Sequence, residues 1–321
     1  MDTIISSVAG NGNQGYSGDG DLATAATMDN PFHVEIDRAE QFLYFADCFN
    51  FRVRRVNLHT GIIENFAGVG TQGHSGDGGL AKSAEIDEIY AVQVDSNGDV
   101  YICQRFNPSI RKIDGNTGII TTVAGTGQPG SGDDNVIATE SELMEPNDCV
   151  LDQQGALLIA DVKDQKVRKL NLKTGLITTF AGTGVKEHTG DGGLASTAGI
   201  HGARAICVDG LGNTYICERE GNTIRRVDES GTITTVAGTG EKGYTGDHGP
   251  SIEAEFNGPK AIRCDQFGNV IIVDTENHAV RVADVSTGKI STVVGGSVGP
   301  HGDGGDPLEA GLARPHGAIT G

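Results

Sequence analysis

The sequence predicts an all-β protein in which one four-stranded antiparallel sheet is repeated along the chain. First, a glycine that ends a β-branched run such as "TTVAG" recurs every 56 to 58 residues, at Gly10, Gly68, Gly125, Gly182, Gly238 and Gly295. Second, each repeat holds four short apolar runs separated by turns rich in Gly, Asn and Asp. Such sheets bury their faces when they stack around an axis, so the predicted fold is a β-propeller.

The elements of one repeat follow in a fixed order. A glycine-rich stretch, "GTQGHSGDGGLAKSAEI", precedes a first strand, "AVQVD", and the turn "SNGD". A second strand, "VYICQ", and a third, "SIRKID", lead through the turn "GNTG" to the fourth, "IITTVAG". The β-branched residues of these runs suit a pleated sheet, and no stretch of useful length has helical periodicity.

The repeats predict a single domain over residues 1–321 with five complete blades, at about 31–68, 89–125, 146–182, 203–238 and 259–295. Residues 4–10 read as a fourth strand without its first three, and residues 314–320 as a first strand without successors. We expect the two to combine into a sixth blade that lacks its second and third strands. Either the chain is trimmed or that blade is reduced. Five blades with flanking strands are the alternative.

These units resemble NHL repeats, in which stretches of the types "SGDGG", "YIAD", "IRKVD" and "TTVAGTG" follow one another. The resemblance covers essentially the whole chain and implies a propeller, commonly six-bladed. It does not imply one function, because this scaffold hosts enzymes, sensors and protein-binding modules.

Composition narrows the partners. A formal net charge of −19 over 321 residues disfavours nucleic acid and anionic membranes. No apolar run approaches the roughly 18 residues of a membrane span, and the N-terminus lacks the pattern of a secretory signal. Six cysteines without a CxxC pair lie mostly in strand runs and predict buried thiols in the cytoplasm. A small-molecule substrate or a protein partner remains.

Two repeated polar positions predict scaffold. The glycine-rich loops each carry one aspartate, where a calcium site would need several acids at alternate positions, so we favour turn carboxylates. An arginine on each third strand predicts one ion pair or hydrogen bond per blade rather than a basic groove. The positions are Asp19, Asp77, Asp133, Asp191, Asp247 and Asp303, with Arg54, Arg111, Arg168, Arg225 and Arg281.

Positions that differ between repeats predict the functional site. One lies at the start of the inner strand and holds Phe32, Tyr90, Asn147, Arg204, Lys260 and His316, with His33, Asp148 and His201 close by. The other follows the second strand, where Gln104–Arg105 and Glu218–Arg219 depart from the usual aspartate, and where Cys48 follows Asp47. Both positions should lie at one mouth of the axial channel, where propeller ligands commonly bind.

The residue types at this mouth suit acid–base chemistry on a small polar substrate, which we expect to be anionic. Histidines transfer protons near neutral pH, and cationic side chains hold carboxylates. The expected catalytic residues are His33, Tyr90, His316, Arg204 and Arg219. The expected substrate-binding residues are Phe32, Asn147, Asp148, Lys260, Arg105 and Cys48.

The site is also similar to that of the peptidyl-α-hydroxyglycine amidating lyases, propellers with zinc-binding histidines in "PHG" or "PHS" and an arginine in "DREN". Here "RPHG" and "ERE" place His316 and Arg219 at matching positions, which implies a zinc site with His316, His33 and His201. The other inner-strand starts carry no histidine at that position. Lyase or hydrolase chemistry, with zinc or calcium as the candidate metal, is therefore one prediction, and a non-catalytic ligand- or protein-binding propeller is the other.

Overall fold

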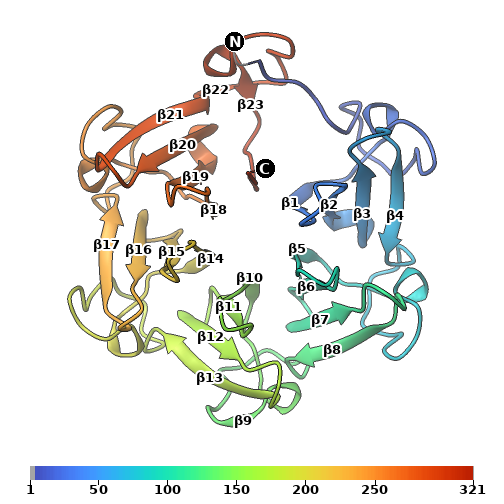
Figure 1. The fold of residues 1–321 in the computed structure, drawn as a ribbon, viewed down its shortest axis with the longest axis horizontal. Coiled ribbons are helices and arrows are strands. Elements are labelled where there is room, and N and C mark those ends of the chain that lie inside the picture. The colour runs from blue at the N-terminus through green and yellow to red at the C-terminus, as the bar shows by residue number, and fades with distance from the viewer. Residues whose placement is uncertain (1–3, 321) are drawn as a thin grey trace. The chain divides into compact units, whose positions relative to one another are not determined.

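A computed structural model describes residues 4–320 and shows strands and short 3-10 helices (Figure 1). The chain divides into two compact units. The N-terminal unit comprises residues 7–149 and 170–178. The C-terminal unit comprises residues 4–6, 150–169 and 179–320. Strands make up nearly all of the regular structure, as the repeat pattern predicts.

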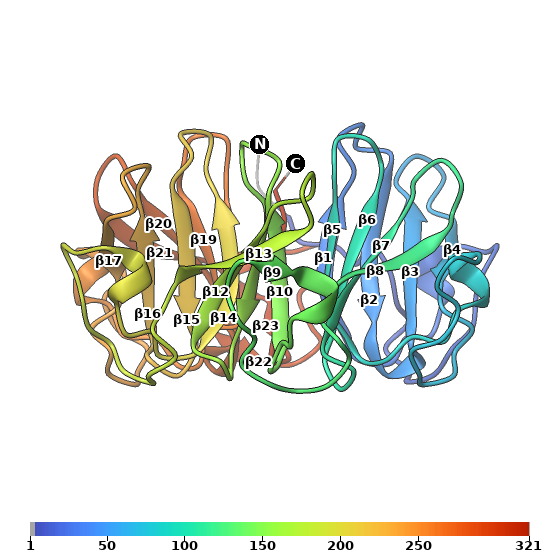
Figure 2. The same cartoon turned by 90° about the horizontal axis from the view of Figure 1, so that it is seen from below.

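The N-terminal unit contains two four-stranded antiparallel sheets, each a blade whose strands follow sequence order. Figure 2 shows the strands of the second blade running side by side. The first is β1 (Pro31–Ile36), β2 (Phe42–Asp47), β3 (Arg52–Asn57) and β4 (Ile63–Ala67); the second is β5 (Ile89–Val94), β6 (Val100–Gln104), β7 (Ser109–Ile113) and β8 (Ile120–Ala124).

The C-terminal unit contains two further antiparallel blades with the same strand order. The fourth blade is β14 (Ala203–Val208), β15 (Thr214–Glu218), β16 (Thr223–Val227) and β17 (Ile233–Ala237); the fifth is β18 (Ala261–Cys264), β19 (Val270–Asp274), β20 (Ala279–Asp284) and β21 (Lys289–Gly295).

The third blade has an additional edge strand, in the order β10-β11-β12-β13-β9. Its strands are β9 (Val136–Ile137), β10 (Pro146–Leu151), β11 (Leu157–Asp161), β12 (Lys166–Leu170) and β13 (Leu176–Ala181).

Short elements complete the described chain. Its 3-10 helices have three residues each, and no helix in residues 4–320 is long and apolar enough to span a bilayer. They are η1 (Ala23–Ala25), η2 (Cys48–Asn50), η3 (Ala81–Ser83), η4 (Ala138–Glu140), η5 (Ala195–Thr197), η6 (Ser251–Glu253), η7 (Thr275–Asn277) and η8 (Pro307–Glu309). A parallel pair, β22 (Ser297–Val298) and β23 (Gly311–Leu312), follows the fifth blade.

Apolar side chains fill the space between consecutive blades within each unit. In the N-terminal unit, Ala46 and Val53 of the first blade pack in one cluster with Ile89 and Ile102 of the second. In the C-terminal unit, Cys217 and Ile272 belong to a cluster shared by blades four and five. Burial of such side chains supplies the main favourable free energy of folding.

The repeated arginines form the ion pairs that the sequence predicts, and their partners are the loop aspartates, a pairing that the sequence did not predict. Arg111 is fully buried and its Nη2 lies 2.6 Å from Asp77 Oδ1, whose carboxylate also accepts the Thr122 backbone N–H. The same pair recurs at 2.6 to 2.8 Å in three other blades, as Arg54–Asp19, Arg225–Asp191 and Arg281–Asp247. The loop aspartates of these pairs are therefore scaffold carboxylates.

The prediction of a sixth, partial blade is wrong. Residues 4–10 and 314–320 form no strand. The Ile5 N–H donates to the Gly305 carbonyl at 3.1 Å and the Gly304 N–H to the Ile5 carbonyl at 2.8 Å, so residue 5 pairs with a loop. Near the C-terminus the Pro315 carbonyl accepts a hydrogen bond from Thr275 Oγ1 at 2.9 Å, and residues 4–320 contain no second strand for residues 314–320. The described chain has five blades, not six.

Candidate functional site

The pairing is irregular at the start of three inner strands, where the variable residues lie. The register shifts in β1 between Pro31 and Val34, in β5 around Tyr90, and in β14 around Arg204. A β-bulge leaves a residue outside the ladder and re-aims its side chain, a device common beside functional sites. The inner-strand position singled out in the sequence is thus a bulge in three blades.

Lys260, which directly precedes β18, and three arginines form a group of four cationic side chains in the C-terminal unit. The Lys260 Nζ lies 3.3 Å from His316 Nε2 and 3.5 Å from Glu276 Oε1, and Lys260 is only 6% exposed. Arg314 Nη2 lies 2.6 Å from the same Glu276 oxygen. The positive charges of Arg204 and Arg219 also act on Lys260. We call Arg204, Arg219, Lys260, Arg314 and His316 the cationic cluster.

The electrostatics of this cluster favour a bound anion. Burial lowers the pKa of Lys260 to about 8, and Arg314, Arg219 and Arg204 add to the shift, against a smaller opposing effect of Glu276. Burial and the neighbouring cations lower the pKa of His316 to about 3, so this imidazole is neutral at physiological pH. A carboxylate or phosphate would offset the repulsion among these groups.

Backbone and side-chain hydrogen bonds hold the cluster in place. The Lys260 N–H donates to the Val273 carbonyl at 3.1 Å, which fixes the residue beside β19. Thr275 donates to the Pro315 carbonyl, which places the following His316 next to the fifth blade. The Arg314 N–H donates to His278 Nδ1 at 3.1 Å. The histidine of the C-terminal segment is therefore positioned by the end of β19, although it lies in no strand.

A cleft of about 730 Å³ opens between the loops of blades four and five. It shares Arg219 and Glu276 with the surroundings of Lys260, so the cleft leads to the cationic cluster. Among residues 4–320, the Arg219 guanidinium has no hydrogen bond or ion pair, and it is partly exposed. The cleft is lined by Lys186, His201, Arg219, Glu220, Asn222, Lys242, Asn257, Gly258 and Glu276.

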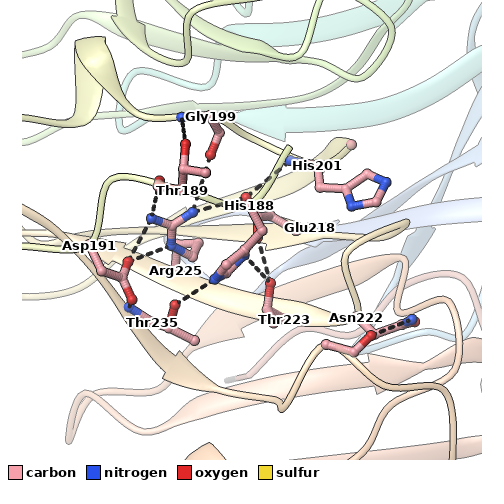
Figure 3. Close-up of polar contacts among 12 residues, drawn as sticks. His188, Thr189, Asp191, Gly199, His201, Glu218, Asn222, Thr223, Arg225 and Thr235 are labelled. Carbon is pink, nitrogen blue, oxygen red and sulfur yellow. Dashed lines mark hydrogen bonds and ion pairs between the residues drawn. The ribbon is translucent and has the colours of Figure 1, made fainter. Parts of the chain in front are cut away.

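A buried carboxylate supports the blade-four wall of this cleft (Figure 3). Glu218 Oε2 accepts hydrogen bonds of 2.5 Å from His188 Nδ1 and Thr223 Oγ1, while Oε1 lies 3.2 Å from Arg225 Nη1. Oε1 also accepts the His201 backbone N–H at 3.1 Å. Burial raises the pKa of Glu218, but the bonds from His188 and Thr223 and the charge of Arg225 outweigh it and hold the pKa below its ordinary value.

The second blade has a neutral version of this network. Gln104 replaces the glutamate, its Nε2 lies 3.2 Å from His74 Nδ1, and its Oε1 accepts a 3.4 Å hydrogen bond from Arg111. Glu218 is thus part of a blade-specific ionic support rather than a group that reaches substrate. In Figure 3 the His201 imidazole points away from this network.

The remaining predicted residues lie in the N-terminal unit, where three of them are in contact. The rings of Phe32 and Tyr90 meet edge to face with centroids 5.0 Å apart, and the Arg105 guanidinium lies 5.2 Å from the Tyr90 centroid. Arg105 also pairs with Glu88 at 3.5 Å and Glu145 at 3.2 Å. Its charge is therefore already compensated, in contrast to that of Arg219.

His33 is buried, with Nε2 3.5 Å from Asp148 Oδ1 and Nδ1 accepting the Val92 N–H at 3.3 Å. The Asn147 amide donates to the Glu145 carbonyl at 2.9 Å. These contacts give both side chains a structural role in this unit. That the residues of the two units face one mouth stays a prediction.

Cys48 is fully buried at the start of η2. Burial and the nearby Glu88 raise the pKa of its thiol. Its environment therefore disfavours the thiolate that a nucleophile or metal ligand needs.

The zinc set implied by the lyase resemblance gains no support. No group of three or more His, Cys, Asp or Glu side chains in residues 4–320 could hold a metal ion. His316 Nε2 faces the Lys260 ammonium, and a cation would be repelled by the surrounding arginines. The donor set of the cluster suits an anion better than a divalent metal.

The sequence did not point to Arg314 of the cationic cluster or to Glu276, which lies beside it. Glu276 lies in η7, two residues after Asp274, the position that is usually an aspartate in these repeats. Arg314 precedes "PHG" and has a positive φ of 52°. The bonds from Arg314 and the charge of Lys260 lower the pKa of Glu276, so it is ionised. Both residues could have been found as departures from the repeat pattern, but the sequence could not show that they pair with each other.

Comparison with known proteins places the chain among repeat propellers, although no protein-family profile matches it. It is 26% identical over 296 residues to chicken teneurin-1, covering 80% of this chain and 11% of that protein. It is 23% identical to the chloroplastic Arabidopsis protein SUPPRESSOR OF QUENCHING 1 over 90% of this chain and 28% of that protein. Human NHL repeat-containing protein 2 is 24% identical over 85% of this chain and 41% of its own length. The chain thus spans less than half of each relative.

Solved structures share the fold at low identity. A Bacteroides thetaiotaomicron protein of unknown function superposes with a TM-score of 0.69 at 18% identity, over 98% of this chain and 69% of that one. Virginiamycin B lyase from Staphylococcus aureus gives 0.51 at 14%, over 89% and 73%. A calcium-binding regucalcin from Agrobacterium tumefaciens gives 0.56 at 16%, over 88% and 81%. Enzymes and binding proteins therefore share this architecture.

Proposed function

Because the chain belongs to the NHL-type β-propellers, a scaffold whose functions reside in its variable loops, we propose that it binds a small anionic substrate at the cationic cluster and acts on it by acid–base chemistry of lyase or hydrolase type. The cluster is the place where several of the variable side chains predicted from the sequence come together: Arg204, Arg219, Lys260 and His316.

The observation that carries the proposal is a local excess of positive charge in a strongly acidic protein. Three arginines act on the charge of Lys260, and Lys260 and Arg314 both lie beside the ionised carboxylate of Glu276, whereas the chain as a whole carries −19. Grouping cations in a partly buried place costs folding free energy. An anion that enters the adjoining cleft offsets that cost, and guanidinium groups bind carboxylate and phosphate oxygens well.

The chain's own groups supply proton transfer. Because its pKa is about 8, Lys260 exists as both ammonium and amine near neutral pH and can give or take a proton. Arg219 reaches the cleft and would hold the anionic group of the substrate. His316 is neutral and would serve as a hydrogen-bond partner of Lys260.

Non-catalytic binding of an anionic ligand or a protein's acidic side chain at the same site is the second candidate. It is favoured by the pKa of His316 of about 3, because so weak a base takes up a proton poorly at neutral pH. Both candidates require the same anion site and differ in whether the ligand is converted.

Titration calorimetry with phosphate, oxalate and pyruvate tests the shared anion site. Lys260→Met and Arg219→Gln should each weaken binding at least tenfold, while the exposed Lys82→Met, a matched loss of charge elsewhere, should not. Equal affinities in all four proteins would refute the proposal. Mass-spectrometric analysis of small carboxylates incubated with the protein then separates conversion from binding.

A further inference from the structure

We propose that Lys260 is an amine nucleophile that forms an imine with a small 2-oxo acid. This deepens the proposed function and rests on its anion site. Lys260 is buried, its amine lies 3.3 Å from the neutral His316 imidazole and is acted on by the charges of three guanidinium groups, and its partner Glu276 lines a cleft large enough for a small metabolite.

The surroundings of Lys260 differ from those of a structural lysine. A structural lysine in a protein interior is held in a close ion pair, whereas among residues 4–320 Lys260 pairs with one carboxylate, Glu276, which lies at 3.5 Å and is shared with Arg314 at 2.6 Å. The lowered pKa means that a substantial fraction of the neutral, nucleophilic amine is present near neutral pH. Burial beside other cations is a known way to activate a lysine for this chemistry.

The ligand class follows from the neighbouring charges. In a 2-oxo acid the carboxylate is bonded directly to the reactive carbonyl carbon. Arg204 and Arg219 both act on the Lys260 charge and can hold the carboxylate, which brings the carbonyl carbon towards Nζ. A neutral aldehyde or ketone lacks the group that these arginines would hold, so the site should discriminate against it.

The atoms of the step balance without an oxidant or reductant. The neutral fraction of the Lys260 amine, which has given one proton to solvent, forms the C–N bond. The carbonyl oxygen takes one proton from the amine and one from solvent, and it leaves as water. The product is the protonated imine, which retains the positive charge that the lysine carried at the start.

Glu276 controls access to the amine. It lines the cleft, contacts Lys260 and is held by Arg314, so its carboxylate occupies the side from which a ligand carboxylate would approach. An entering 2-oxo acid displaces this carboxylate and takes over its interactions with the cations.

Reductive trapping tests the proposal. The protein is incubated with pyruvate and sodium cyanoborohydride and then digested for peptide mass spectrometry. We expect one reduced pyruvyl adduct on Lys260, at least tenfold above any other lysine. Lys260→Arg should lose it, and Lys82→Arg, which alters an exposed lysine outside the cleft, should keep it. Acetone should label far less than pyruvate.

The pH dependence of trapping separates this proposal from anion binding alone. The rate should rise with pH and level off near about pH 8, whereas pyruvate affinity should fall above that pH. One outcome would overturn the nucleophile and leave the anion site standing. In it, the unaltered protein binds pyruvate and Lys260→Met weakens that binding, but reductive trapping yields no adduct. Adducts spread over exposed lysines, or unchanged in Lys260→Arg, also overturn it.

Independently, we infer that Cys207 and Cys264 form a disulfide when a disulfide oxidant is present. Their Sγ atoms lie 2.9 Å apart, on the neighbouring inner strands β14 and β18 and at positions 57 residues apart, one repeat length. Both are thiols in this structure. With oxidised glutathione, two thiols exchange into one protein disulfide and two molecules of reduced glutathione, so electrons and protons balance.

Thiol counting and peptide mapping test the pair. After exposure to oxidised glutathione, the folded protein should lose two alkylatable thiols and yield one cross-linked peptide pair containing residues 207 and 264. The Cys264→Ser variant should form no cross-linked peptide pair. The Cys48→Ser variant should form the same cross-link as the unaltered protein. Six alkylatable thiols after oxidation, or a cross-link between other cysteines, would overturn the inference.

Discussion

Replacing Glu218 by glutamine isolates the contribution of one buried charge. The carboxylate receives hydrogen bonds from His188 and Thr223 and lies 3.2 Å from Arg225. Glutamine keeps the shape and one acceptor but places an amide N–H where two donors now point. The second blade shows that the scaffold accepts this side chain, since Gln104 occupies the equivalent position.

The expected cost follows from the bonds that lose their charge. A hydrogen bond to a charged group contributes roughly 1.5–3 kcal/mol, and removing one partner of a buried ion pair costs about 3–5 kcal/mol. Because glutamine still accepts one bond and His188 is partly exposed, we expect Glu218→Gln to lower the free energy of unfolding by about 2–3 kcal/mol near neutral pH.

The pH dependence gives the sign. The folded-state pKa of Glu218 lies below its ordinary value of 4.5, so its stabilising effect is complete above that pH and is lost as pH falls through the folded pKa. In urea unfolding, the protein and its Glu218→Gln variant should therefore differ most in stability near neutral pH, and the difference should shrink as the pH falls below 4.5 and through the folded-state pKa.

The exposed Glu229→Gln is the matched control and should change stability by less than about 0.5 kcal/mol at every pH. A Glu218→Gln protein as stable as this control near neutral pH would refute the reasoning. So would a difference that does not shrink in acid, because the loss would then come from shape rather than charge.

Three further outcomes are expected. Glu276→Gln should tighten phosphate binding several-fold by calorimetry, because it removes the internal carboxylate beside Lys260; weaker binding would contradict this. In the unaltered protein the same affinity should fall above about pH 8, as Lys260 loses its proton, rather than near the ordinary lysine pKa of 10.5. Gly68→Ala should lower the melting temperature more than Gly20→Ala: both have φ near +90°, but an added Cβ meets the Phe51 carbonyl at 2.3 Å only at Gly68.

The repeat predicted the blades well because its positions report local physics. The arginine on each third strand predicted one ion pair or hydrogen bond per blade, and Arg111 forms it with Asp77, which was predicted only as a turn carboxylate. The number of blades was wrong for a different reason. Residues 314–320 have the composition of an inner strand, but a strand also needs a partner, and Pro315 hydrogen-bonds to Thr275 instead.

The site was predicted as a set of positions, not as a set of contacts. The inner-strand starts supplied Arg204, Lys260 and His316 because these residues break the repeat. The sequence could not predict the protonation states of these side chains. Lys260 was expected to hold the substrate as an ammonium ion, whereas burial among arginines lowers its pKa to about 8. Glu276, which shares an oxygen between Lys260 and Arg314, lay outside the positions considered.

The same contrast explains how a repeated scaffold acquires one reactive place. Arg225 and Arg281 sit at equivalent positions, and each faces a loop aspartate, which neutralises it. Arg219, in contrast, makes no such close ion pair among the described residues, although its charge acts on the neighbouring Glu220, and Lys260 shares its carboxylate with Arg314. The positive charge that is only partly balanced there is the property that an anionic ligand can use, and it arises where the fifth blade meets a segment that is not a strand.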